Sequence, residues 1–317
     1  MDAIRLDNTE FEGRNAVYLF DGERTVLVDA GLAVPAVREQ LVDGLADHGV
    51  SVSDLDEILL THWHADHSGL AGALQREADV PVRAHEDDAA LAAASEDALA
   101  EMAEVRNRRF EEWNIPPGPR EQLVSFLESH ADENGDPADL TPIEDGETVM
   151  AGDEVLTAVH TPGHTVGHVA YAREDGTVLT GDALLPQYTP NVGGADPRLA
   201  DPLGHYVDTL ERLIDADYDR GYPGHRTPIA DPTARAREIL GHHRDRTRRV
   251  IDVLAERDRA DAWTVGADLF GDLADIHILH GPGEAYAHLE HLRAHGLVER
   301  TGDEYRLAAD AAVEVPF

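Results

Sequence analysis

The amino-acid sequence predicts an α/β fold in which a layered sheet is followed by a smaller, mostly helical segment. Short apolar runs of strand length alternate with amphipathic helical patterns in the first 231 residues. Loops rich in histidine and aspartate follow several of these runs, and beyond residue 231 the sequence becomes helical and rich in arginine. We therefore expect two domains, residues 1–231 and 232–317, in line with about 150 residues per domain.

The first predicted elements form a βαβ arrangement. Asp21-Gly22-Glu23 separates two apolar runs and predicts a hairpin. Val37, Leu41 and Leu45 recur at i, i+4 and i+8, which predicts a helix. The predicted elements, in order, are strands over 15–20 and 25–29, a helix over 35–47, a strand over 57–61, a helix over 68–78 and a strand over 80–84.

Residues 86–130 interrupt this alternation with Ala- and Glu-rich helical sequence, which predicts a helical insertion. The insertion either packs against the domain or covers a site. Strands resume over 154–160, 168–172 and 177–180, followed by a Pro- and Gly-rich loop over 185–203 and a helix over 206–215. In the second domain we expect helices over 233–257, 265–270 and 284–295 and a terminal hairpin, an order typical of a winged helix.

Charge and cysteine content restrict the chemistry. The chain has 26 basic residues, all of them arginine, and 63 acidic ones, so its net charge is 26 − 63 = −37. Because molar salt screens such repulsion, this composition indicates a host with a salt-filled cytoplasm. The N-terminus lacks a signal-peptide pattern and no run is long enough for a membrane span, so we expect a cytoplasmic protein. Without cysteine, a metal ion must be held by His, Asp and Glu.

The strongest chemical signal is the run His62-Trp63-His64-Ala65-Asp66-His67 at the end of a predicted strand. In an extended loop His62 and His64 project to the same side and can reach one ion, whereas Asp66 and His67 can reach a second. His164, Asp182 and His225 each lie just past another predicted strand, where α/β sheets build their sites. The pattern predicts two metal ions.

These segments, together with the turn Val28-Asp29-Ala30-Gly31, resemble the metallo-β-lactamase superfamily over about residues 11–230. The loop of residues 184–191 is similar to that of a branch with an appended winged helix, whose members are glyoxalase II-like or endoribonuclease-like. The resemblance implies an αββα sandwich. It also implies a division of the metal ligands: His62, His64 and His164 for one ion, Asp66, His67 and His225 for the other, and Asp182 bridging.

The implied mechanism is hydrolysis. Two divalent ions lower the pKa of a shared water, so that bridging hydroxide is present at neutral pH. Zinc is the expected metal, although His and Asp ligands also suit Mn and Fe. Asp66 would orient the nucleophile and pass its proton to the leaving group. Further residues are expected to support the ligands or line the pocket: Asp29, His168, Tyr188 and Arg226.

The expected substrate is a small thioester, ester or lactone. Antibiotic hydrolysis is not expected, since the best-known class of zinc β-lactamases carries Cys at the Asp182 position and uses a Lys that this chain lacks. A metal-dependent single-stranded RNA endonuclease is the alternative, supported by the Arg-rich run at 242–249. A non-catalytic regulator fits poorly with a complete ligand set.

Charge argues against nucleic acid as a partner. Residues 232–317 hold 11 Arg against 16 acidic residues, a net of −5, and residues 1–231 hold 15 against 47, a net of −32. The candidate recognition helix carries Glu284, Glu290 and a single Arg293, so its carboxylates would face phosphates. We expect this domain to serve packing or self-association, as in a homodimer, and to bind no specific DNA sequence.

Overall fold

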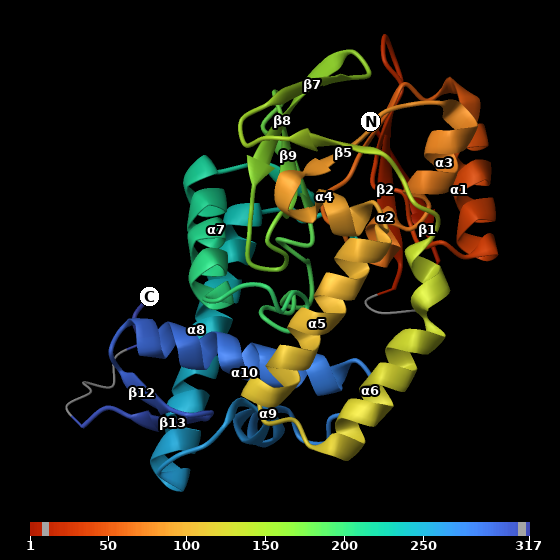
Figure 1. The fold of residues 1–317 in the computed structure, drawn as a ribbon. Helices are drawn as coiled ribbons and strands as arrows, with labels where there is room; N and C mark the ends of the chain where they lie inside the picture. Colours follow the sequence, from red (N-terminus) through yellow and green to blue (C-terminus); the bar gives the residue numbers. More distant parts are fainter. Residues whose placement is uncertain (8–12, 310–314) are drawn as a thin grey trace.

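The structure is a computed structural model that describes residues 1–7, 13–309 and 315–317. Two β-sheets face each other, and helices cover their outer faces (Figure 1). This is the layered α/β architecture that the sequence predicts. None of the helices in the described part of the chain has the length and apolar composition that a membrane span requires.

The first sheet contains strands in the order β1-β2-β3-β4-β5-β6. The first three are antiparallel, and β3 to β6 are parallel. Parallel pairing places the carboxyl ends of β3, β4 and β5 at one edge. The strands are β1 (Asp2–Leu6), β2 (Asn15–Phe20), β3 (Val26–Val28), β4 (Glu57–Leu59), β5 (Val82–His85) and β6 (Leu140–Ile143).

The second sheet has the order β11-β10-β9-β8-β7. Only the β10–β11 pair is parallel, so the loops that follow these two strands also emerge together. The strands are β7 (Thr148–Ala151), β8 (Glu154–His160), β9 (Val169–Arg173), β10 (Thr177–Gly181) and β11 (Arg220–Pro223).

Strand β2 explains how the layers pack. Its side chains alternate between two cores, as expected for a period of two. Tyr18 and Phe20 point between the sheets, against Leu156 and Tyr171 of the second sheet. Leu19 points outward and packs against Leu41 of α1. The helices beside the first sheet are α1 (Pro35–Asp47), η1 (Val52–Asp54), α2 (Ala65–Ser68) and α3 (Ala71–Ala78).

The expected insertion consists of α4 (Glu86–Ala92), α5 (Glu96–Glu112) and α6 (Pro117–Ser129), followed by η2 (Ala131–Asn134). The apolar side chains of α5 and α6 do not pack on the sheets. Phe110 and Trp113 share a core with Leu254 and Tyr286 from the C-terminal segment. In Figure 1, α5 and α6 extend away from the sheets toward α9 and α10. The sequence predicts that the insertion packs against the first domain or covers a site; most of its buried apolar side chains instead pack against the C-terminal segment.

The remaining elements are α7 (Pro202–Ala216), α8 (Pro232–Arg257), α9 (Ala262–Phe270), α10 (His277–Ala294), β12 (Val298–Thr301) and β13 (Glu304–Leu307). The last two pair as an antiparallel hairpin. Helices α7 and α8 share a further core, to which Ala287 of α10 contributes. The C-terminal segment therefore packs against both the insertion and the sandwich.

Several expected helices differ from the structure, and those expected from 206 and 265 begin earlier, at Pro202 and Ala262. The helix expected over 68–78 is two helices that begin at Ala65 and Ala71, because a Cβ at Gly69 would collide with backbone and Leu70 N–H donates to Gly31 O. The last long helix begins at His277 and not at Glu284. Gly281-Pro282-Gly283 predicts a break, yet Pro282 lies inside the helix, and a Cβ on Gly283 would lie 2.3 Å from Gly194 Cα. The helix continues through Pro282, and Gly283 lies close to the loop at Gly194, a contact that the sequence does not show.

Candidate metal centre

The predicted ligands lie close together, in segments that follow the ends of strands. His62, His64, Asp66 and His67 follow β4 and enter α2, and Asp182 and His225 follow the parallel strands β10 and β11. His164 lies in the loop between β8 and β9. All seven predicted ligand side chains meet between the carboxyl ends of the two sheets. Their nitrogen and oxygen atoms form overlapping groups whose members lie within 4.8 Å of one another.

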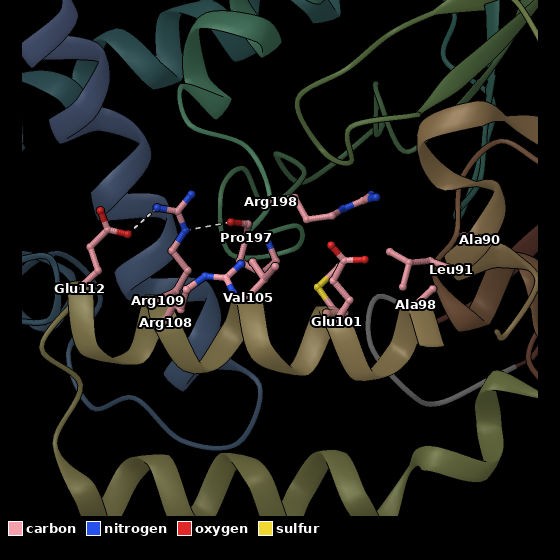
Figure 2. A pocket seen from close by; sticks show the side chains of 11 residues that line it. Ala90, Leu91, Ala98, Glu101, Val105, Arg108, Arg109, Glu112, Pro197 and Arg198 are labelled. Carbon is pink, nitrogen blue, oxygen red and sulfur yellow. Dashed lines mark hydrogen bonds and ion pairs between the residues drawn. The ribbon is translucent and has the colours of Figure 1, made fainter. Parts of the chain in front are cut away.

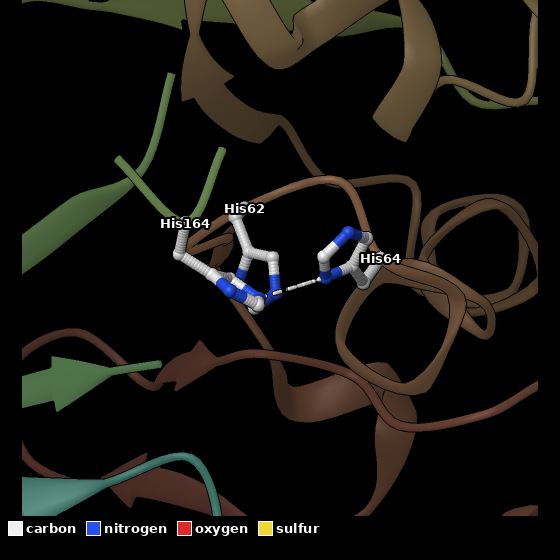
Figure 3. Close-up of side chains that lie close together, drawn as sticks. All are labelled: His62, His64 and His164. Atoms are coloured by element: carbon white, nitrogen blue, oxygen red, sulfur yellow. Dashed lines mark hydrogen bonds between the residues drawn. The ribbon is translucent and has the colours of Figure 1, made fainter. Parts of the chain in front are cut away.

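The three-histidine group consists of His62, His64 and His164 (Figure 3). The Nε2 atom of His62 lies 2.9 Å from Nδ1 of His64, and Nε2 of His164 lies 3.0 Å from that same Nδ1. Three ring nitrogens therefore converge on one point. This donor set is suited to a single divalent ion.

The second group, which we call the acidic group, consists of Asp66, His67 and His225. The Nε2 atoms of the two histidines lie 3.3 Å apart, and Asp66 Oδ2 is 3.4 Å from His225 Nε2. Asp182 stands between the groups. Its Oδ2 is 3.2 Å from His225 Nε2 and 3.8 Å from His164 Nε2, a position suited to a bridging ligand.

Each ligand histidine is held through the nitrogen that points away from the centre. An oxygen acceptor fixes that nitrogen as N–H, so in the neutral ring the lone pair is on the inward nitrogen, the form that binds a metal. The acceptors are Thr61 Oγ1 for His62 (3.0 Å), Ala195 O for His64 (3.1 Å), Asp29 Oδ2 for His67 (2.8 Å), Asn191 O for His164 (2.9 Å) and Gly13 O for His225 (3.0 Å).

A further observation supports metal binding by these residues. The Oδ1 atom of Asp182 is buried and has no hydrogen-bond partner. A buried carboxylate oxygen without a donor is costly unless a cation satisfies it. The residues present therefore fit a pair of divalent ions.

The two groups differ in their electrostatics. Burial, together with the neighbouring rings, holds the pKa of His62 well below its ordinary value and lowers that of His64 to about 4. Burial also lowers the pKa of His164. The three-histidine group is therefore neutral at pH 7.

In the acidic group burial again favours the neutral ring, but the carboxylates outweigh it. Asp182, Asp66 and Asp29 raise the pKa of His67 to about 10. Asp182 and Asp66 raise the pKa of His225 to about 8. Against the effect of its own burial, the pKa of Asp182 is held far below its ordinary value by His225 and His67. The metal-free acidic group thus holds protons in place of a cation.

The expected supporting residues occupy different places. Asp29 accepts from Thr61 N–H (2.8 Å) and lies against His67, so it ties β3 to the ligand loop. His168 accepts from the Asp182 amide (3.0 Å), which orients the bridging carboxylate. Tyr188 is 49% exposed, and the Arg226 guanidinium lies 4.8 Å from its ring centroid. These two side chains contact each other, and no contact of theirs with a ligand atom is found in the described part of the chain.

Sequence reasoning missed several supporting residues. Asn15 Nδ2 donates to Asp66 Oδ2 at 3.1 Å and holds that carboxylate. Asp88 accepts from Thr165 Oγ1 (2.6 Å) and Gly167 N (3.0 Å), which fixes the loop that carries His164. No local signal marks Asn15 or Asp88, because each acts through residues far away in the sequence.

A cavity of about 570 Å³ lies between α5 and the loop at Pro197 and Arg198 (Figure 2). Leu91, Met102 and Val105 give it an apolar wall, and none of the seven ligand residues lines it. Pro197 lies two residues after Ala195, whose carbonyl accepts from His64, so one loop contributes both to the cavity and to the three-histidine group.

Comparisons with known proteins agree with this geometry. The sequence profile described as "Metallo-beta-lactamase superfamily" matches residues 9–225. A crystal structure of a metallo-beta-lactamase family protein from Thermus thermophilus is 31% identical, with a TM-score of 0.85 over 97% of this chain and 98% of that chain. A beta-lactamase domain protein from Burkholderia ambifaria, 24% identical, has the same fold, with a TM-score of 0.82 over 96% of this chain and 92% of that chain.

Curated relatives are similar over different lengths. A probable metallo-hydrolase from Bacillus subtilis strain 168 is 28% identical over 300 residues, which is 92% of either protein. The lactamase-like protein nscB of Neosartorya fischeri is 27% identical over 255 residues, 79% of this chain. This chain spans 60% of the length of that fungal protein.

Proposed function

Because this chain belongs to the metallo-β-lactamase superfamily and is a metallo-hydrolase of that type, we propose that it is a dinuclear hydrolase of small thioesters, esters or lactones. The main observation in support is the set of seven donor side chains that lie close together, with Asp182 between the two groups. His62, His64 and His164 would hold one ion, and Asp66, His67 and His225 the other. Zinc is the metal we favour, with Mn and Fe as outcomes of metal analysis.

When bound, two divalent ions supply Lewis acidity toward a carbonyl oxygen and a lowered pKa for water. The chain's own contribution is orientation. Asn15 donates to Asp66 Oδ2, and the neighbouring His67 and His225 hold the pKa of Asp66 below its ordinary value, although burial opposes them. Asp66 is therefore ionised at neutral pH, and in this proposal it would accept the proton of the attacking water and deliver it to the leaving group.

The cavity between α5 and the loop at Pro197 supports a small substrate with an apolar part. Its wall of Leu91, Met102 and Val105 offers contact to an acyl chain or ring, and its lining loop also carries the Ala195 carbonyl that holds His64. The exposed Arg108 at the same cavity offers a cation to an anionic substituent. We therefore expect acyl substrates with an apolar acyl group.

No contact among the described residues favours RNA. The guanidinium groups of the arginine-rich run at 242–249 are engaged within the chain. Arg246 pairs with Glu284, Arg248 pairs with Asp245, and Arg244 and Arg249 donate to the carbonyls of Phe317 and Leu269.

The test is a substrate panel assayed with metal-loaded protein in molar KCl, because salt screens the repulsion that a net charge of −37 produces. The panel contains acyl thioesters, aryl esters, lactones and single-stranded RNA. We expect turnover of an acyl substrate that falls at least about 100-fold in Asp66→Asn, the size of a lost general acid–base contribution. RNA cleavage without acyl hydrolysis would reverse the choice of substrate class.

A further inference from the structure

One loop holds two metal ligands from behind. In the segment between β10 and α7, Asn191 O accepts from His164 Nδ1 at 2.9 Å, and Ala195 O accepts from His64 Nε2 at 3.1 Å. Both histidines belong to the three-histidine group. The orientation of two of its three rings therefore depends on where this loop places two carbonyl oxygens.

The Asn191 side chain fixes the shape of that loop. Its Oδ1 accepts from Gly194 N (3.0 Å) and Ala195 N (2.7 Å), which closes the turn that presents the Ala195 carbonyl. Its Nδ2 faces the other way and donates to Glu284 Oε2 at 3.1 Å and to His280 O at 3.2 Å. The same asparagine thus connects the ligand-holding loop to α10.

Glu284 receives the loop and is itself held firmly. Its carboxylate is 3% exposed, and Oε2 also accepts from Val192 N at 3.2 Å. Its other oxygen pairs with Arg246 of α8. Gly283 lets α10 approach this closely, since a Cβ there would lie 2.3 Å from Gly194 Cα.

We propose that Glu284 is a positioning residue for the metal centre: through Asn191 it holds the loop whose carbonyls orient His64 and His164. This proposal rests on the proposed metal centre. It assigns the C-terminal segment a role in metal binding that neither packing nor self-association includes. A carboxylate is required because both oxygens receive donors, Arg246 on one and the loop on the other.

Glu284→Gln tests the proposal, with Glu290→Gln as the matched control. An amide at 284 must turn its NH₂ toward either Arg246 or the loop donors, so one contact becomes repulsive. Glu290 lies on the same helix, is 4% exposed, and accepts from Tyr305 Oη (2.6 Å) and Arg293 Nε (2.7 Å) but contacts no ligand-holding loop. The two variants suffer the same chemical change in similarly buried places.

The readout is the stepwise affinity for Zn²⁺, measured by chelator competition, alongside thermal unfolding of the metal-free protein. We expect both variants to unfold at lower temperature. Only Glu284→Gln should weaken one of the two ions, by about 10-fold, the lower range for losing a group that orients a ligand. Equal Zn²⁺ affinities in the two variants would overturn the proposal.

A second pair of variants tests the connection itself. Asn191→Asp places a carboxylate oxygen against Glu284 Oε2 and His280 O, so Zn²⁺ affinity should fall about 10-fold. Adding Glu284→Gln supplies an NH₂ donor to the new carboxylate and should recover at least about half of that loss on a logarithmic scale. Losses that multiply in the double variant would overturn the proposal. Wild-type protein that binds fewer than two ions would instead contradict the dinuclear centre.

Discussion

The three-histidine group and the acidic group lie on either side of Asp182 and are buried to a similar depth, yet their metal-free protonation states are opposite. Burial, aided by the neighbouring rings, keeps His62 and His64 neutral. In the acidic group the carboxylates of Asp66 and of the neighbouring Asp182 and Asp29 outweigh burial and raise the pKa of His67 to about 10, so that this ring stays protonated. The distribution of carboxylates, not depth, thus decides which half binds a metal directly and which half must first release protons.

Asp29 contributes to this difference. It belongs to neither ligand group, but it lies 2.8 Å from His67 Nδ1 and also receives Thr61 N–H. In the three-histidine group, His64 and His164 have backbone carbonyls in the corresponding positions. A charged acceptor strengthens the bond and the basicity of the ring, whereas a carbonyl only orients it.

The largest effect should come from removing what the halves share. Asp182→Ala deletes the carboxylate that lies 3.2 Å from His225 Nε2 and 3.8 Å from His164 Nε2. We expect affinity for both ions to fall more than about 100-fold, because each loses a charged ligand. Elemental analysis after dialysis should show less than one ion per chain. Retention of one tightly held ion would mean that Asp182 serves one half alone.

The halves should separate in His225→Ala. Among the ligand side chains of the described residues, the His225 ring contacts His67, Asp66 and Asp182. We expect one ion to be lost and the other to stay within about threefold of its wild-type affinity, since the three-histidine group keeps all its donors. Zn²⁺ titration with a competing chelator measures this. Equal loss of both ions would contradict the division into two groups.

Proton release should distinguish the halves in the wild-type protein. His67 and His225, with pKa values raised to about 10 and about 8, are largely protonated at pH 7 and must deprotonate to bind a metal. His64, with its pKa lowered to about 4, is already neutral.

Affinity for the ion of the acidic group should therefore rise with pH. The rise should be roughly a hundredfold per unit below about pH 8, where both rings must release a proton, and roughly tenfold per unit between about pH 8 and 10, where only His67 must. The other ion should change little between pH of about 6.5 and 8. Calorimetric titration in buffers of different ionisation enthalpy counts the protons. Identical proton counts for the two ions would show that the two halves do not differ in charge.

The smallest effect is expected for Asp29→Asn. The amide oxygen can still accept from His67, but its NH₂ then faces Thr61 N–H, and one of the three charges that raise the pKa of His67 is gone. We expect about a 10-fold loss of affinity for the acidic-group ion and release of fewer protons on binding. Thr61→Val, which removes the hydroxyl beside His62 Nδ1 and Asp29 Oδ2, is a useful contrast because it disturbs both halves mildly. An unchanged proton count in Asp29→Asn would show that Asp182 and Asp66 suffice.

Much of the sandwich could be predicted because its signals are local. The spacing of apolar side chains along β2 and α1 can be read from each segment alone. Both elements have the expected bounds. The ligand run after β4 is equally local, since neighbouring side chains at one strand end must share one region of space.

The residues that sequence reasoning missed act over long separations. Asn15 holds Asp66, Asp88 holds the loop of His164, and Glu284 receives Asn191. From the sequence, Glu284 is part of a candidate recognition helix whose carboxylates would face phosphates, and no burial is predicted for this carboxylate, which is 3% exposed. Its partner, Arg246, is on another helix, and no spacing rule connects the two.

The core that the insertion shares with the C-terminal segment has a consequence for biosynthesis. Phe110, Trp113 and Leu123 are buried by residues that lie more than a hundred positions later, among them Leu254 and Leu289. While the chain is being translated, the insertion therefore has no partner, and its apolar face stays open until the last helices leave the ribosome. Premature termination in the C-terminal segment would produce a nascent protein that carries the entire ligand set together with an uncovered, aggregation-prone surface.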